Sequence, residues 1–166
     1  MDDKLSDIDL VVLSTPMSEY EKIIPNLNKY LNKNCLITDV GSTKENILKL
    51  KNKKLSKSLD WITSHPISGS EVSGPEHGTK NLFVNKWCVV VSDKNKIKQS
   101  KLLKFWKKLG SNVIIMDAKI HDKIFSITSH LPHLIAYNLI KTAQDFQKKQ
   151  NKDVIKFSAG GLRDFS

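Results

Sequence analysis

The chain has 166 residues, of which 39% are apolar and 27% are charged, the composition of a folded globular protein and not of a disordered tail. No apolar run approaches the roughly 18 residues of a membrane span, the polar first residues show no signal peptide, and two cysteines without CxxC spacing exclude a disulfide scaffold and indicate the reducing cytoplasm. The net charge of +10 comes from lysines spread along the chain, with Arg163 as the single arginine, so it does not indicate a nucleic-acid partner, for which arginine is preferred.

The first predicted elements are a buried strand and a helix. The continuous apolar run at 8–14 (IDLVVLS) is typical of a strand covered on both faces, as in a parallel sheet. Ser18 and Glu21 form a capping box that predicts the start of a helix, and apolar residues at helical spacing continue to Leu31. Pro25 is expected to kink this helix.

The alternation of strands and helices continues along the chain. Ser42 and Glu45 form a second capping box, which predicts a helix through the lysine-rich stretch up to Lys57. An amphipathic pattern predicts a further helix over residues 96–109. Its predicted inner face contains Leu102, Phe105, Trp106 and Leu109. The remaining predicted strands are 35–40, 61–64, 87–92 and 112–116.

The character of the sequence changes after Asp117. Strands alternate with helices over residues 1–117, which predicts an α/β domain with a parallel sheet. From residue 118 to about 149 the pattern is one long, mostly helical stretch that contains Pro132. We therefore expect a second, all-α domain to begin at 118 and to include residues 118–166.

Polar residues follow three of the predicted strands. Ligands bind at the carboxyl ends of strands in parallel sheets, so Thr15, Ser42 and His65 are expected at one edge. Pro66 favours an extended backbone at His65, which keeps that histidine in its strand. Ser42 has two interpretations, as a helix cap or as a hydroxyl that binds a ligand or orients His65. His65 is compatible with a structural role, but its place before a glycine-containing loop favours a group that accepts a proton near neutral pH.

The other histidines do not predict a metal site. His130 and His133 are three residues apart on one helical face, near Pro132. His77 and the pair His121-Asp122 would be further ligands, but the spacing matches no zinc pattern, so we expect no metal. The segment 41–44 (GSTK) lacks the frame of a phosphate-binding loop.

The motifs, taken in order, resemble the prephenate dehydrogenase family, which includes arogenate and cyclohexadienyl dehydrogenases. The resemblance runs from about Asp7 to Ser166, and the set HPISGSE, SHLPH and GGLRDF is specific, whereas each piece alone is weak. The matching segments are STP at 14–16, DVGSTK at 39–44, HPISGSEVSGPEHG at 65–78, LF at 82–83, WCVVVS at 87–92, FWKKLG at 105–110, IMDAKIHD at 115–122, SHLPHLIAYNL at 129–139 and SAGGLRDFS at 158–166.

The resemblance implies the oxidative decarboxylation of prephenate by NAD or NADP to 4-hydroxyphenylpyruvate, in tyrosine biosynthesis. It implies that His65 accepts a hydrogen bond from the ring hydroxyl and that Ser42 assists it beside the nicotinamide. The resemblance also implies contacts to substrate and cofactor at other positions that match the family's motifs. The substrate-binding positions are His133, Glu71 and Asp164, and the cofactor-binding positions are Thr15, Pro16, Ser42 and Ser129.

Two departures from the family pattern bear on the extent of the chain. The first βαβ unit of a Rossmann-like domain, with its GxGxxG turn, has no counterpart here, and the family's arginine after DFS lies beyond Ser166. We therefore interpret the chain as an internal fragment. It comprises the C-terminal part of a Rossmann-like domain over 1–117 and the start of an all-α, homodimer-forming domain over 118–166, and it is expected to be poorly active alone. Arogenate dehydrogenase, or a truncated non-catalytic homologue that acts as an interaction module, are the alternatives.

Overall fold

The computed structural model describes residues 7–69, 74–150, 153 and 155–157. The chain divides into two compact units, residues 1–122 and 123–166, and each is described by itself. The first unit contains β1 (Leu10–Leu13), η2 (Met17–Glu19), α1 (Tyr20–Tyr30), β2 (Leu36–Asp39), α2 (Glu45–Lys54), β3 (Asp60–Trp61), β4 (Ser64–Pro66), η3 (Pro75–His77), β5 (Trp87–Val91), α3 (Lys96–Lys108), β6 (Asn112–Met116) and most of α4 (Ala118–Phe125). The second contains the end of α4, the π-helical turn η4 (Ser126–His130), α5 (Leu131–Gln150) and η5 (Ile155–Phe157).

Two three-stranded sheets form the first unit. In the order β1-β2-β3 all neighbours run parallel, as the buried apolar runs predicted. In the order β4-β5-β6 the pair β5 and β6 is parallel, but β4 and β5 are antiparallel, with His65 opposite Val89. The expectation of a parallel sheet is therefore wrong for this pair. Residues 67–86 connect β4 to β5, and an antiparallel pair of strands needs no crossover helix between them.

The strand predicted at 61–64 is divided between the two sheets. β3 pairs with β2, and the Ile62 N–H still donates to the Ile37 carbonyl of β2. One residue later the Thr63 carbonyl accepts from the Val91 N–H of β5, and β4 then pairs with β5. Residues 60–66 thus join the two sheets, and His65 lies in the part that follows the junction.

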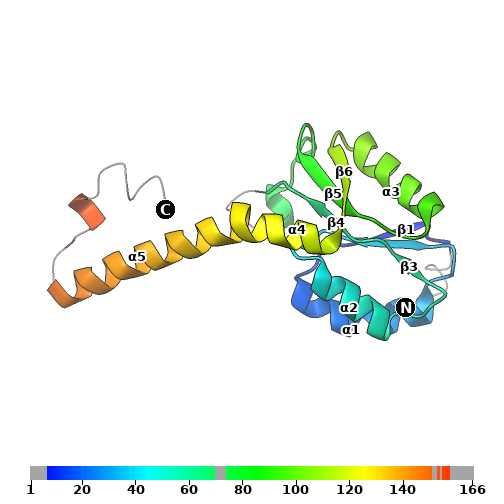
Figure 1. Cartoon of the computed structure of the whole chain (residues 1–166), viewed down its shortest axis with the longest axis horizontal. Coiled ribbons are helices and arrows are strands. Elements are labelled where there is room, and N and C mark those ends of the chain that lie inside the picture. Colours follow the sequence, from blue (N-terminus) through cyan, green and yellow to red (C-terminus); the bar gives the residue numbers. More distant parts are fainter. Residues whose placement is uncertain (1–6, 70–73, 151–152, 154, 158–166) are drawn as a thin grey trace. The chain divides into compact units, whose positions relative to one another are not determined.

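Helices cover both sides of the strands (Figure 1). α1 and α2 lie together on one side and enclose a core around Tyr20, Ile37 and Trp61, and the rings of Tyr20 and Trp61 meet edge to face at 5.6 Å. α3 lies on the other side and buries Leu102 and Trp106 against Ile62 and Val90. These buried apolar faces are the main stabilisation of the unit.

Helix boundaries differ from the sequence predictions in several places. Glu19 and not Ser18 is the N-cap of α1, and it makes no side-chain cap hydrogen bond, so the first capping box is not formed. Pro25 lies inside α1 without ending it. α3 ends at Lys108, so the predicted inner residue Leu109 is 37% exposed, although Leu102 and Trp106 are buried as expected.

The second unit is a nearly continuous helix. The π-helical turn η4 lies between α4 and α5, so that Pro132 is the second residue of α5 and not a mid-helix break. Several large apolar side chains of α5 are exposed, among them Leu134 at 58% and Tyr137 at 73%. None of the described helices is long and apolar enough to cross a membrane.

Candidate active site

The segments that follow β1 and β2 meet at the carboxyl edge of the first sheet. β1 and β2 run parallel with Leu13 opposite Asp39, so both chains leave the sheet at the same level. Thr15 and Pro16 are exposed there. A Cβ atom on Gly41 would come within 2.9 Å of the Met17 Sδ atom, so a larger residue here would force the Met17 side chain to move.

A buried ion pair fixes the turn between β2 and α2. The Asp39 and Lys44 side chains are both 0% exposed, and Lys44 Nζ donates to Asp39 Oδ2 at 2.6 Å and to the Ser64 carbonyl at 2.6 Å. Asp39 also accepts from the Trp61 indole N–H at 3.0 Å and from the Gly41 N–H at 3.0 Å. Burial raises the pKa of the Asp39 carboxyl and lowers the pKa of the Lys44 ammonium, and their mutual attraction opposes both shifts.

Ser64 ties the strand that carries His65 to its surroundings. Its hydroxyl donates to the Asp39 carbonyl at 2.8 Å, lies 2.9 Å from Thr38 Oγ1 and accepts from the Trp106 indole N–H at 3.1 Å. All of these groups are buried. The backbone immediately before His65 is therefore held from β2 and from α3.

His65 contacts a second histidine, which in turn contacts a carboxylate. The His65 Nδ1 and His121 Nε2 atoms are 2.9 Å apart, and His121 Nδ1 lies 2.8 Å from Asp122 Oδ1. His121 is fully buried, whereas His65 is half-buried. The backbone at His65 is extended within β4, as the following Pro66 predicted.

Asp122 also caps a helix from a distance. Its two carboxylate oxygens accept from the Lys44 N–H at 2.7 Å and from the Glu45 N–H at 2.9 Å, at the start of α2. Partial burial by itself raises the pKa of the Asp122 carboxyl, but the Glu45 N–H, His121 and the Lys44 N–H together lower it below its ordinary value. The start of α2 is thus joined to His65 through Asp122 and His121.

The interpretation of Ser42 as a helix cap is wrong. α2 begins at Glu45 with Lys44 at the N-cap, and the cap hydrogen bonds come from Asp122. The Ser42 side chain is exposed, two residues before this N-cap. Ser42 therefore lies on the turn between β2 and α2. In the same turn Gly41 packs against Met17, and Lys44 donates to the Ser64 carbonyl.

The other predicted site residues belong to the second unit or lie outside the described part. Ser129 is in η4 and is half-buried, and His133 is exposed in the first turns of α5. Glu71 and Asp164 lie outside the described residues. In the described ranges no group of three metal-ligating side chains comes together.

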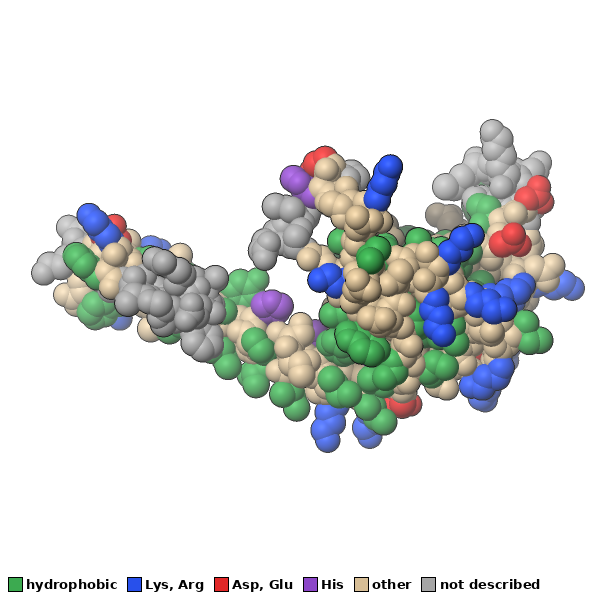
Figure 2. Space-filling model, turned by 90° about the horizontal axis from the view of Figure 1, so that it is seen from above, with side chains coloured by type: hydrophobic (Ala, Val, Ile, Leu, Met, Phe, Trp, Pro, Cys, Tyr) green, Lys and Arg blue, Asp and Glu red, His purple; other side chains and the backbone are tan. Residues whose placement is uncertain are grey.

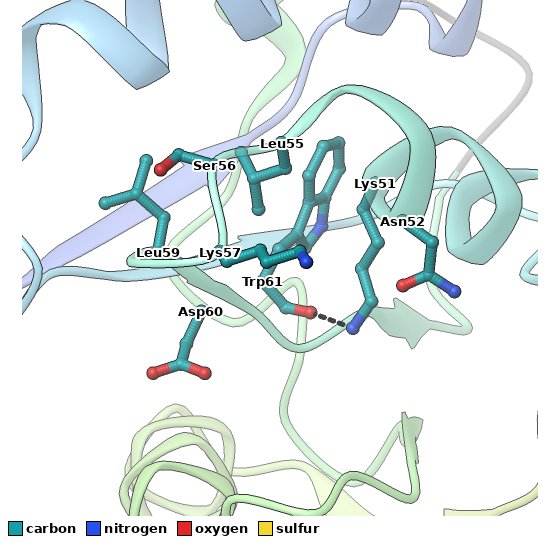
Figure 3. Close-up of a pocket in the computed structure, with 8 residues that line it drawn as sticks. All are labelled: Lys51, Asn52, Leu55, Ser56, Lys57, Leu59, Asp60 and Trp61. Carbon is teal, nitrogen blue, oxygen red and sulfur yellow. Dashed lines mark hydrogen bonds between the residues drawn. The ribbon is translucent and has the colours of Figure 1, made fainter.

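The first unit has a cavity of about 360 Å³ at a different place (Figure 3). Lys51, Lys57, Asp60 and Trp61 are among its lining residues, and Lys51 Nζ donates to the Trp61 carbonyl at 2.6 Å. The cavity lies where α2 ends and β3 begins, and none of its lining residues was predicted as part of the site. On the face shown in Figure 2, lysine side chains stand at separate places instead of forming one basic patch.

Sequence reasoning missed the groups behind His65. His121 and Asp122 were considered only as metal ligands, and Asp39 and Lys44 only as parts of a motif. Most of their contacts join residues that are far apart in the chain, up to 78 positions for Asp122 and Lys44. The adjacent pair His121-Asp122, placed soon after a predicted strand, was the one available signal.

Comparison with known proteins identifies the family of the chain. Residues 1–115 match the family described as prephenate dehydrogenase, nucleotide-binding domain, and residues 117–166 match the prephenate dehydrogenase dimerization domain. The cyclohexadienyl dehydrogenase of Zymomonas mobilis is 31% identical over 98% of this chain and 56% of its own length. The prephenate dehydrogenase of Lactococcus lactis is 33% identical over 96% of this chain and 44% of its own length.

Solved structures show the same fold. Prephenate dehydrogenase from Aquifex aeolicus, in complex with hydroxyphenyl propionate and NAD+, superposes with a TM-score of 0.85 and 32% identity, over 95% of this chain and 55% of that one. The chain thus spans about half the length of the curated relatives it matches. The two family matches together cover nearly every residue, and the chain belongs to the prephenate dehydrogenase family.

Proposed function

We propose that this chain carries the hydride-transfer site of an NAD(P)-dependent dehydrogenase that converts prephenate to 4-hydroxyphenylpyruvate and CO₂. The observation that carries the proposal is the half-buried His65 imidazole, which contacts the buried His121 and follows Ser64, whose hydroxyl donates to the carboxyl end of β2 at Asp39. Membership in the family supports the reaction class. A bound NAD+ in the Aquifex aeolicus relative supports the cofactor class.

The chemistry needs a group that accepts a proton beside the reacting carbon. A nicotinamide, when bound, would supply the hydride acceptor for the ring carbon that bears the hydroxyl. As that carbon becomes carbonyl-like, His65 accepts the hydroxyl proton. Loss of the ring carboxylate as CO₂ then returns electrons to the ring, the oxygen regains the proton, and the aromatic product forms with His65 neutral again.

The residues at the edge suit the hydroxyl-rich nicotinamide end of a dinucleotide. Thr15 and Pro16 after β1 and Ser42 after β2 are exposed at adjacent strand ends, where α/β sheets bind ligands. Ser42 is free of a capping role, so its hydroxyl can bond the ligand or orient His65. The sequence contains no GxGxxG turn, so it offers no pyrophosphate cradle of that type.

The second unit is proposed to complete the substrate site and to form a homodimer. His133 and Asp164 of the second unit, together with Glu71 of the first, are the proposed substrate contacts, and Ser129 is the proposed contact to the nicotinamide. The exposed apolar side chains of α5 support an interface, because a solvated helix rarely leaves so many uncovered. The family match to a dimerization domain supports the same assignment.

The test compares substrates in a full-length version, in which this sequence is extended to the length of its curated relatives. Turnover of prephenate with NAD+ or NADP+, at rates well above those with arogenate, supports the proposal. Faster turnover of arogenate assigns the amino-acid analogue instead. A folded, dinucleotide-binding protein that turns over neither substrate supports the non-catalytic interaction module.

A further inference from the structure

The described residues contain an imidazole and a carboxylate behind His65 that the proposed reaction does not use. His121 is fully buried and contacts both His65 and Asp122. We propose that Asp122 and His121 are positioning residues that hold His65 as the Nδ1–H tautomer, so that its Nε2 atom is the proton acceptor. This proposal depends on the proposed function in one respect, which is that the proposed function identifies the substrate hydroxyl as the proton donor to His65.

The first step is the charge state of Asp122. Its carboxylate accepts two backbone N–H bonds, from Lys44 at 2.7 Å and from Glu45 at 2.9 Å, at the start of a ten-residue helix. Backbone donors and the positive end of a helix dipole both favour the ionised form. An ionised carboxylate can only accept hydrogen bonds, so the His121 Nδ1 atom, 2.8 Å away, carries the hydrogen.

The second step is the tautomer of His121. A fully buried imidazole is favoured in its neutral form, because a buried charge is costly. The two backbone N–H groups already stabilise part of the Asp122 charge, so the carboxylate stabilises a second proton on His121 less strongly. A neutral His121 with hydrogen on Nδ1 has a lone pair on Nε2, and this atom is 2.9 Å from His65 Nδ1.

The third step follows at His65. Because His121 Nε2 accepts, His65 Nδ1 must donate, and the neutral His65 ring then has no hydrogen on Nε2. That nitrogen is the one a substrate hydroxyl can use. When His65 becomes charged during the reaction, its Nδ1–H bond to His121 persists and the Asp122 carboxylate offsets the charge. The logic is that of a nucleophile–histidine–aspartate triad, with an additional imidazole between the base and the carboxylate.

A purely structural role for Asp122 is the competing explanation, and the chain offers a matched control. Asp117 also caps a helix through one carboxylate, which accepts from the Lys119 N–H at 2.8 Å and the Ile120 N–H at 3.2 Å. The Asp117 carbonyl accepts from the His121 N–H at 2.9 Å, but among the described residues the Asp117 carboxylate has no hydrogen bond to a histidine side chain. Asp117→Asn therefore removes the negative charge at the start of α4, the helix that carries His121 and Asp122, while the side-chain contacts of those two residues stay in place.

The decisive measurement is the histidine tautomer in the 166-residue chain, from long-range ¹H–¹⁵N spectra near pH 8. We expect the hydrogen of His65 on Nδ1, a shift toward Nε2–H in Asp122→Asn, and no change in Asp117→Asn. A His65 hydrogen on Nε2 in the unmodified chain overturns the proposal, and so does an unchanged tautomer in Asp122→Asn. If Asp122→Asn does not fold, the unmodified spectrum still decides.

Kinetics in the full-length version give the second readout. A base held in the wrong tautomer costs about 10²–10⁴-fold in kcat, so Asp122→Asn should show such a loss with KM values within about threefold, whereas Asp117→Asn stays near normal. His121→Gln keeps an acceptor near Nε2 and should exceed His121→Leu in kcat by about tenfold or more. Equal losses in the two aspartate variants overturn the proposal. If the unmodified enzyme turns over neither substrate, the proposed function fails, and the tautomer spectra alone decide the role of Asp122.

Discussion

The buried pair of Asp39 and Lys44 should be the most sensitive charged site in the first unit. Replacing Asp39 with Asn leaves the Lys44 ammonium at 0% exposure with only neutral acceptors, such as the Ser64 carbonyl, in place of the carboxylate. Breaking a buried pair by removing one partner costs about 3–5 kcal/mol. We expect Asp39→Asn to lower the free energy of unfolding by that amount.

The measurement is urea unfolding of the chain, followed by tryptophan fluorescence and circular dichroism. Trp61 is a useful probe, because its indole N–H donates to Asp39. The control is Glu19→Gln, which breaks an ion pair with Lys22 whose side chains are 42% and 73% exposed. An exposed pair contributes about 0–1 kcal/mol, so this variant should stay close to the unmodified chain.

The double variant separates the pair from its parts. Asp39→Asn with Lys44→Met removes both charges, and its cost should be clearly smaller than the sum of the two single losses. A loss below about 1 kcal/mol for Asp39→Asn, or a strictly additive double variant, would refute the view that the two charges depend on each other.

The sign of the pH dependence provides an independent check. In Lys44→Met the Asp39 carboxyl keeps the burial that raises its pKa, without the ammonium that opposes the shift. A group with a raised pKa in the folded state favours folding at low pH and loses that contribution as the pH rises. The stability deficit of Lys44→Met should therefore shrink as the pH is lowered from about 8 to about 4.

Four further predictions concern the site and the thiols. In the full-length version, His65→Asn should lower kcat by about 10²–10⁴-fold with little change in dinucleotide affinity, and a near-normal kcat would remove His65 from the mechanism. His133→Asn should raise KM more than it lowers kcat, and steady-state kinetics with the reverse pattern would argue against a binding role. The lowered pKa of Asp122 contributes stability above its ordinary value of 3.8 that is lost as the pH falls, so the stability difference between the chain and Asp122→Asn, from urea titrations, should vanish in acid. Burial raises the pKa of Cys88 from 9.0 to about 12, so at about pH 8 it should react with a thiol reagent about 10³-fold more slowly than in concentrated urea.

Local sequence signals predicted most of the elements. The strand at 112–116 has the predicted bounds, and the apolar runs at 35–40 and 87–92 contain β2 and β5. Periodicity predicted α3 to within one residue. Each of these elements depends on side chains that are neighbours in sequence, and this is the information that a pattern holds.

Contacts between distant residues could not be predicted in this way. The direction of β5 relative to β4 depends on the path of residues 67–86, which has no periodic pattern. The cap of α2 comes from Asp122, 77 positions beyond Glu45, although a serine and a glutamate stood at the spacing of a local capping box. The distant carboxylate replaces the local hydroxyl because it bonds two N–H groups at once.

The site was predictable to a similar degree. His65 was singled out from its strand-end position, its proline neighbour and the family resemblance, and the structure places it in β4. The groups that hold it, Ser64 and His121, were not, because their partners come from several elements that are distant in the sequence.

Residues 60–66 are the segment that both sheets share, and this has a consequence for how the histidine moves. Any sliding of one sheet against the other must stretch this segment, which is bonded to β2 before Thr63 and to β5 from Thr63 onward. Backbone amides around the junction should therefore exchange with deuterium only when the whole unit opens. His65 lies in this doubly bonded segment, so small backbone motions elsewhere in the unit should leave the position of its imidazole unchanged.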